Sequence, residues 1–372
     1  MTTLQIFLLL LAVLALLLAL IFGLFRVRRR QAPAPTTSPA SQVGSTTQAP
    51  RTMSSPAVPS AHPEAVEEAA ARHEVMHRMH VLALETGMPQ TSSNEDLHEQ
   101  LASAIRWALT RITEQANYAP RRPLLLPKLV AAMNDDDTSR RELAHIITSD
   151  PSLAGTLLKL ANSPFYRVAN EPIESLDRAI AVLGMEGMRS LVAAALMQPV
   201  FRIEGGGFPQ FGDVLWQHTL SSATAAQAHA TMIEHADPFA AQLLALMMGM
   251  AAIVVFRLTI DQYEQRHLSP LPRVVMTLLT TQTAPVARQV AASWQLTERM
   301  EVALADQTAP QGVGISALGR SLLVGRFIGA LDVLHQRRIL DDAAVYAALR
   351  TSGDSAEAYE RIWMRRNERN RY

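Results

Sequence analysis

The stretch DPSLAGTLLKLANSPFY, residues 150–166, predicts a short helix with a defined beginning and a defined end. Asp150 followed by Pro151 is the usual pairing of an N-cap with the first helical residue. The apolar residues recur at helical spacing, at Leu153, Leu157, Leu158 and Ala161. The stretch then closes on Asn-Ser-Pro, where Pro164 prevents the helix from continuing.

Asn162 and Ser163 admit a catalytic and a structural interpretation. As a nucleophile, Ser163 would need a general base and an oxyanion donor, and the sequence identifies neither. As a helix end, Asn162 can take the left-handed conformation and bond nearby backbone groups, while Ser163 bonds within the turn. We therefore expect the pair to terminate a helix.

Helical patterns surround this stretch and predict an all-α fold. The expected helices cover residues 128–133, 139–148, 176–183, 188–197, 211–234 and 238–258. Gly184 lies where a left-handed residue would close a helix. No sustained alternation of period two is bounded by hairpin turns, so no sheet is expected. Residues 238–256 carry no charge, and we expect a buried core helix there in preference to a membrane span.

Residues 64–118 contain two further helical patterns that precede this body. The first, at 64–85, opens with acidic residues, and the second follows a possible capping box at Ser93 and Asp96. Together they predict an αα-hairpin or a juxtamembrane helical pair. His73, His77 and His80 share one face of the first pattern, which we expect to be solvated.

The N-terminal segment from Leu4 to Phe25 contains 22 residues without a charge. As a helix at about 1.5 Å per residue it would reach roughly 33 Å, enough to cross a bilayer core. The basic residues follow the run and are absent before it, which favours an uncleaved anchor over a signal peptide. By the positive-inside rule the rest of the chain faces the cytoplasm, so we expect a single-pass protein of the inner membrane.

Residues 26–63 are rich in Pro, Ser and Thr and predict a linker without a core. The whole chain has a formal net charge of zero, so no global field favours nucleic acid as a partner. It has no cysteine, which excludes disulfides, thiolate catalysis and cysteine zinc sites. The basic C-terminal residues 361–372 follow several acids, and we expect a terminal helix that packs on its own domain.

Three motifs occur in order along the chain. They read Asp-Pro-x-Leu at 150–153, Leu-Leu-x-Leu-x-Asn-Ser at 157–163 and Ala-Ile-x-x-Leu-Gly at 179–184. In this order they resemble the HDOD output domain of bacterial signalling proteins. The signature residues are Asp150, Pro151, Leu157, Asn162, Ser163, Leu183, Gly184 and Trp216. We expect an HDOD-like domain at 119–310 and a C-terminal helical extension at 311–372.

The resemblance implies a fold similar to that of HD-type phosphohydrolases, which bind metal through a His, an adjacent His-Asp pair and a later Asp. His218 matches the first ligand position, but the pair falls at Ala245 and Leu246. A one-residue shift of the alignment changes nothing, because no His, Asp or Glu occurs from 239 to 260. His218 is therefore expected to be a lone vestigial ligand position.

No other acidic or histidine residue in this part of the sequence replaces the missing metal ligands. His235 and Asp237 lie upstream of a proline, where Asp237 fits an N-cap better than a ligand. The histidines that are common in the family near Asp306 and Gln307 are missing here. The sequence therefore predicts no metal site, no catalytic residue and no cofactor.

These observations favour a membrane-tethered, non-catalytic scaffold that binds partner signalling proteins, and they leave formation of a homo-oligomer open. One alternative is a divergent metal-dependent phosphohydrolase acting on nucleotides or cyclic dinucleotides. Another is a small-ligand sensor that uses the former metal cleft as an apolar pocket.

Overall fold

The structure is a computed structural model that describes residues 63–85, 95–123, 126–127, 147, 151–167, 171–201, 203, 207–309 and 314–370. The expected anchor at 4–25 lies outside the described residues, as does the linker before Pro63. The helix expected at 128–133, nearly all of the one expected at 139–148, and Asp150 lie outside them too.

The described residues form helices and no strand, which confirms the predicted all-α class. The helices are α2 (Pro63–Ala83), α3 (Glu95–Leu109), α6 (Pro151–Ala161), α7 (Leu176–Met197), α8 (Phe211–His229), α9 (Pro238–Glu264), α10 (Pro272–Ser293), α11 (Glu298–Ala305), α12 (Ala317–Gln336), α13 (Asp342–Arg350) and α14 (Ala356–Asn370). They all fall in one compact unit, Pro59–Tyr372.

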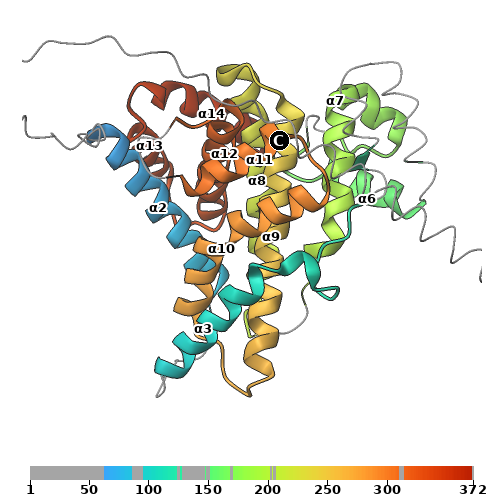
Figure 1. Ribbon diagram of the computed structural model, residues 1–372. Coiled ribbons are helices and arrows are strands. Elements are labelled where there is room, and N and C mark those ends of the chain that lie inside the picture. The colour runs from blue at the N-terminus through green and yellow to red at the C-terminus, as the bar shows by residue number, and fades with distance from the viewer. Residues whose placement is uncertain are drawn as a thin grey trace, which may run out of the picture. The chain divides into compact units, whose positions relative to one another are not determined.

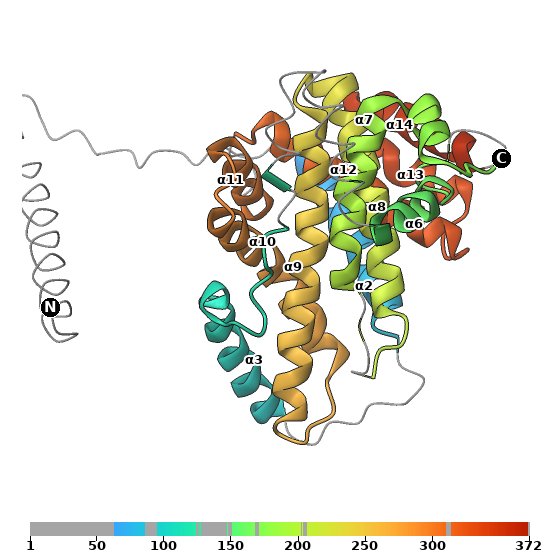
Figure 2. The ribbon, with the colours of Figure 1, turned by 90° about the vertical axis from the view of Figure 1, so that its right-hand side faces the viewer.

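Helix α9 forms the centre of this unit (Figure 2). Asp237 caps its first turn by accepting a hydrogen bond from Ala240 N at 3.0 Å, and Pro238 occupies the first turn. Every residue from Phe239 to Phe256 is buried, which confirms the core helix expected there. The segment Leu176–Phe201 is also long and apolar enough to cross a membrane, but part of it packs on α9.

Helices α8 and α12 pack along each other beside α9 (Figure 1). Small residues make this close approach possible, because Gly325 and Gly329 of α12 face Ser222 and Ala226 of α8. The helix expected at 211–234 is α8 followed by a π-helical turn, Ala230–Glu234.

Helices α2 and α3 pack mainly on the body of the domain. Helix α2 lies against α12, α8 and α10, whereas α3 lies against α10 and α9 (Figure 1). The two segments expected as an αα-hairpin or a juxtamembrane helical pair each pack on helices of the domain body.

The C-terminal helices complete the same core. Helix α12 begins after residue 310 and is central to the packing, while α14 buries Tyr359, Ile362 and Trp363. This burial confirms that the described part of the basic C-terminal segment packs on its own domain.

Candidate functional site

The carboxamide of Asn162 joins the end of α6 to the chain that leads into α7. Its Nδ2 donates to the carbonyl oxygens of Leu158 and Ile173, each at 2.8 Å. Its Oδ1 accepts from the backbone N–H of Ile173 at 2.7 Å. Asn162 thus pairs with both backbone groups of Ile173, as a neighbouring strand would.

The expected left-handed conformation of Asn162 is wrong. The described non-glycine residues with positive φ are His235, His267, Gln295 and Arg338. Asn162 ends the helix through its side chain, which satisfies backbone groups on two segments without a left-handed turn. Ser163 donates from Oγ to Leu160 O at 2.6 Å, so its hydroxyl proton is used within the turn.

The other signature residues hold the same region together. Pro151 begins α6, and Leu157 is buried in the core. Gly184 interrupts α7 with φ 69° and ψ 179°, a region that is essentially restricted to glycine, and its extended ψ differs from the left-handed helix end that we expected. Trp216 contacts Phe201 with ring centroids 4.7 Å apart.

His218 is buried on α8 with its Nε2 3.1 Å from the Arg326 carbonyl oxygen and 3.2 Å from Ser222 Oγ. The carbonyl oxygen can only accept, so Nε2 carries the ring proton and donates it. This nitrogen is therefore not available as a metal ligand.

Helix α9 places Ala245 beside His218 at a small cavity of about 20 Å³, and Leu246 is fully buried. The cavity can hold one water-sized species. A nucleotide has no room there, so the cleft at His218 does not suit the apolar ligand pocket that the sequence left open.

Helix α2 closes this cleft. Met76, Met79 and His80 line the cavity, and His80 is only 7% exposed. The expectation of one solvated histidine face is wrong for His80, while His73 and His77 are exposed. Burial lowers the pKa of His80 to about 3 and that of His218 to about 4, so both rings are neutral at pH 7.

The residues at this cleft do not fit a catalytic metal ion. A cation would meet the guanidinium of Arg326, which lines the same cavity, and would find no carboxylate among the described lining residues. No group of three or more His, Asp or Glu residues within the described ranges could hold a metal.

Asp237 and Asp306 lie near the expected metal-ligand positions in the sequence, and both have structural roles. Asp237 caps α9 and forms an ion pair with Arg299 at 2.7 Å. Asp306 accepts hydrogen bonds from Ser316 N at 2.9 Å and from Ser316 Oγ at 2.5 Å, and so fixes the start of α12.

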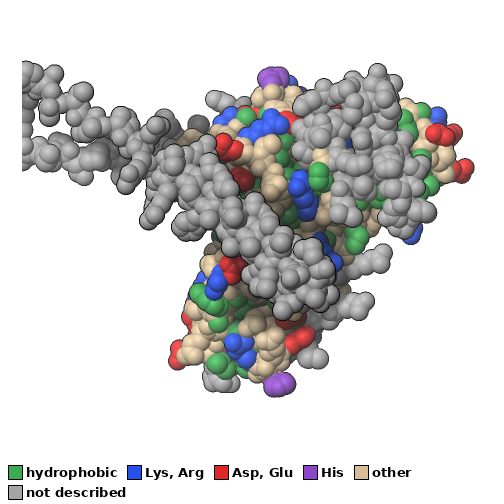
Figure 3. Space-filling model, turned by 45° about the vertical axis from the view of Figure 1, so that its right-hand side comes forward, with side chains coloured by type: hydrophobic (Ala, Val, Ile, Leu, Met, Phe, Trp, Pro, Cys, Tyr) green, Lys and Arg blue, Asp and Glu red, His purple; other side chains and the backbone are tan. Residues whose placement is uncertain are grey.

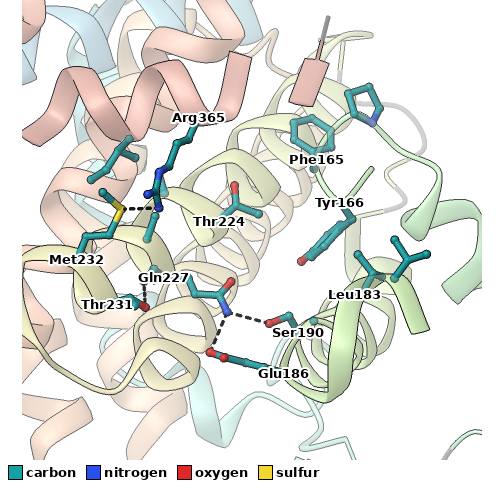
Figure 4. A pocket seen from close by; sticks show the side chains of 16 residues that line it. Phe165, Tyr166, Leu183, Glu186, Ser190, Thr224, Gln227, Thr231, Met232 and Arg365 are labelled. Atoms are coloured by element: carbon teal, nitrogen blue, oxygen red, sulfur yellow. Dashed lines mark hydrogen bonds between the residues drawn. The ribbon is translucent and has the colours of Figure 1, made fainter. Parts of the chain in front are cut away.

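A larger groove, of about 400 Å³, lies between the α6–α7 region and helices α8 and α14 (Figure 4). Its apolar lining includes Phe165, Val182, Leu183, Met232 and Ile362. Its polar side chains include Glu186, Gln227 and Arg365, and Gln227 Nε2 lies 3.3 Å from both Glu186 Oε1 and Ser190 Oγ. Phe165 and Leu183 place the groove beside the signature motifs.

Sequence reasoning did not find this groove or the position of Arg326. The groove is lined by segments from Pro164 to Arg365, and Arg326 lies 108 residues from His218. Only helix packing brings these side chains together. A local signal was present in the adjacent Asn-Ser-Pro motif, but it indicated a helix end and no cavity.

Comparisons with solved structures find matches at low identity and with TM-scores below 0.5. A candidate metal-dependent phosphohydrolase from Shewanella amazonensis SB2B is 17% identical, with 73% of this chain and 99% of that chain covered and a TM-score of 0.49. An HDOD domain protein from Geobacter sulfurreducens is 18% identical, with 73% of this chain and 98% of that chain covered and a TM-score of 0.47. A candidate signal transduction protein from Marinobacter aquaeolei VT8 is 18% identical, with 82% of this chain and 65% of that chain covered and a TM-score of 0.42. No curated protein matches the chain.

The family comparison carries more weight because it covers more than half of the chain. The HDOD domain matches residues 119–310, which contain the Asn162 side-chain bridge, the Gly184 break, the central helix α9 and His218. The chain therefore belongs to the HDOD family.

Proposed function

We propose that this chain is a membrane-tethered, non-catalytic scaffold in signal transduction that binds partner proteins through its HDOD domain. The proposal rests on the side chains that occupy the cleft at His218, which are apolar where metal ligands would be expected. Ala245 and Leu246 stand at the positions of the expected ligand pair, and Met76 and Met79 of α2 close the space beside them.

Metal-dependent hydrolysis needs a divalent ion that activates water, and the ion needs carboxylate and imidazole ligands that converge on it. Here the one matching imidazole donates its Nε2 proton to the Arg326 carbonyl oxygen. The cavity of about 20 Å³ also leaves no space for a phosphate ester. These contacts support binding over bond cleavage as the role of the domain.

The groove of Figure 4 is the surface that we propose for the partner. Its described lining is mixed, with apolar side chains beside polar ones, one exposed acid, Glu186, and one exposed base, Arg365. Apolar side chains combined with polar and charged ones are typical of surfaces that bind protein segments. The fitting occupant is a segment of a partner protein with an apolar anchor flanked by one basic and one acidic side chain.

Site-specific photo-crosslinking in the cell tests this surface. A benzoylphenylalanine at Leu183, within the groove, is expected to capture a discrete partner. The same probe at Val302, an apolar residue of α11 that is 45% exposed and outside the groove lining, serves as the control. Arg365→Glu is expected to lower the Leu183 crosslink several-fold, whereas Arg361→Glu, an exposed position of the same helix, leaves it unchanged.

Equal crosslinking from Leu183 and Val302, or a Leu183 crosslink that Arg365→Glu does not affect, would overturn the groove as the partner surface. Capture of a small molecule in place of a protein would favour a ligand sensor that uses the same groove.

The tether rests on the uncharged run from Leu4 to Phe25 and the arginines that follow it. We expect the full chain to stay with membranes after an alkaline carbonate wash and to be protected from protease in intact spheroplasts. A matched variant with Leu10→Arg and Leu17→Arg is expected to leave the membrane fraction. Equal membrane retention of both chains would contradict the tether.

Metal analysis of the purified full-length chain separates the scaffold from the enzyme. We expect no stoichiometric iron or manganese, and no difference in metal content between the wild type and His218→Ala. Stoichiometric metal that is lost on His218→Ala would instead support a divergent phosphohydrolase.

A further inference from the structure

The guanidinium of Arg326 is a positive charge without a counter-charge among the described residues. Arg326 lies on α12 and lines the cavity at His218, and no described residue forms an ion pair or hydrogen bond with its guanidinium. Burial lowers the pKa of Arg326 to about 10, and no nearby acid raises it again. At pH 7 the group is nevertheless charged.

Arg326 is half-buried, so its guanidinium loses part of the water that would solvate the charge and gains no counter-charge from a described residue in exchange. The two histidines at the cavity cannot compensate this charge, because an imidazole is either neutral or positive. The other lining residues that the structure describes are of the types Met, Leu, Ala, Gly, Ser and Thr, and none of these carries a carboxylate. A counter-ion from solution would remove the imbalance.

The cavity also presents hydrogen-bonding groups whose capacity the described residues do not fully use. His80 is more than nine-tenths buried, and its Nδ1 has no hydrogen-bond partner. Ser222 Oγ can accept from His218 Nε2, which leaves its own proton free to donate. Thr219 and Thr283 donate to carbonyl oxygens one turn back and contribute no free donor.

We propose that this cavity binds one small monovalent anion of the chloride class, held by Arg326 with N–H and O–H groups from His80 and Ser222. The volume of about 20 Å³ admits one water-sized ion and leaves no room for phosphate or carboxylate ligands. The family resemblance implies a metal cation at this position, whereas the arginine that lines the cleft in place of acidic ligands favours an anion. It does not depend on the scaffold function.

Chloride binding can be measured on the purified full-length chain in a neutral detergent. The melting temperature is recorded while chloride replaces gluconate at constant ionic strength and pH 7.5, and the ³⁵Cl NMR linewidth is measured in parallel. We expect the melting temperature of the wild type to rise by several degrees and the chloride signal to broaden. Arg288→Gln, which removes an exposed arginine of α10, is expected to keep both effects.

Arg326→Gln is expected to abolish both effects, and His80→Leu is expected to weaken chloride binding several-fold. If Arg326→Gln does not fold, the wild type, His80→Leu and Arg288→Gln still decide the question by ³⁵Cl NMR. A wild-type chain with the same melting temperature in both salts and no line broadening would overturn the proposal and indicate a water in the cavity. Line broadening that persists in Arg326→Gln, or in His80→Leu at full strength, would overturn it by placing the ion elsewhere.

Discussion

Gly329 of α12 lies so close to Ser222 of α8 that a methyl group on the glycine would stand 2.7 Å from the serine backbone nitrogen. It would also meet the serine hydroxyl and would stand 3.0 Å from Ser222 Cα. Real Cβ atoms do not approach backbone this closely, so the separation of α8 and α12 depends on the absence of a side chain at this position.

We predict that Gly329→Ala lowers the free energy of unfolding by about 1–3 kcal/mol, because the two helices must move apart and disturb the packing around them. Urea denaturation of the wild type and the variant provides the measurement.

Gly155 offers a matched control for this substitution. It is an exposed glycine of α6, and a Cβ there meets nothing within 4 Å. Gly155→Ala is expected to stabilise the chain by about 0.5–1 kcal/mol through helix propensity alone. Similar effects of the two substitutions would contradict the close approach of α8 and α12.

Asn162→Asp is predicted to destabilise the fold by about 2 kcal/mol, since it keeps one acceptor but loses the two donors to Leu158 and Ile173. The new carboxylate would also face two carbonyl oxygens. Thermal unfolding provides the measurement, with Ser163→Ala as the control, which loses one hydrogen bond and is expected to cost about 1 kcal/mol. A larger effect of Ser163→Ala would contradict the bridging role of Asn162.

Met79→Ala is predicted to cost about 2–5 kcal/mol, because Met79 is fully buried where α2 closes the cleft. Val81 lies on the same helix with 51% exposure, so Val81→Ala is expected to stay within about 0.5 kcal/mol of the wild type. Equilibrium denaturation of both variants provides the comparison. Equal, small effects would show that α2 does not belong to the cooperative core.

The stability of the chain is predicted to fall as the pH drops from 6.5 towards 4. Burial lowers the pKa of His229 to about 4, while the unfolded chain titrates near the ordinary value of 6.5. Between these values the unfolded state binds a proton that the folded state does not, so acid favours unfolding. Above pH 6.5 both states are neutral at this residue, and its contribution to stability is fully present.

His229→Gln is expected to reduce the slope of unfolding free energy against pH by about 1.4 kcal/mol per pH unit over most of this interval. His77→Gln changes an exposed histidine and serves as the matched control substitution. Urea titrations at pH 7.5, 6 and 5 provide the slopes. An unchanged slope in His229→Gln would show that this histidine is not held neutral in the folded chain.

The sequence predicted features that depend on local chemistry. Proline at the start of α6 and α9, the Asp237 cap and the break at Gly184 follow from helix-end preferences that a short window of residues contains. The interior position of residues 238–256 could also be predicted, since an apolar run with short amphipathic neighbours favours a core helix.

The sequence did not predict features that depend on how helices meet. Asn162 reaches Ile173, which lies beyond the helix that it ends, and no local preference specifies that partner. The spacing of His73, His77 and His80 predicts one solvated face, because the local sequence does not show which other helices pack on that face. The burial of His80 depends on α8 and α12, which lie more than a hundred residues further along the chain.

The position of α2 has a mechanical consequence. The chain enters the described domain at Pro63, the first residue of α2, and the same helix covers the cleft with Met79 and His80. A pulling force on the N-terminal part of the chain would therefore load α2 before any other described helix. The helix that first receives such a force is thus the one that covers the cleft with Met79 and His80.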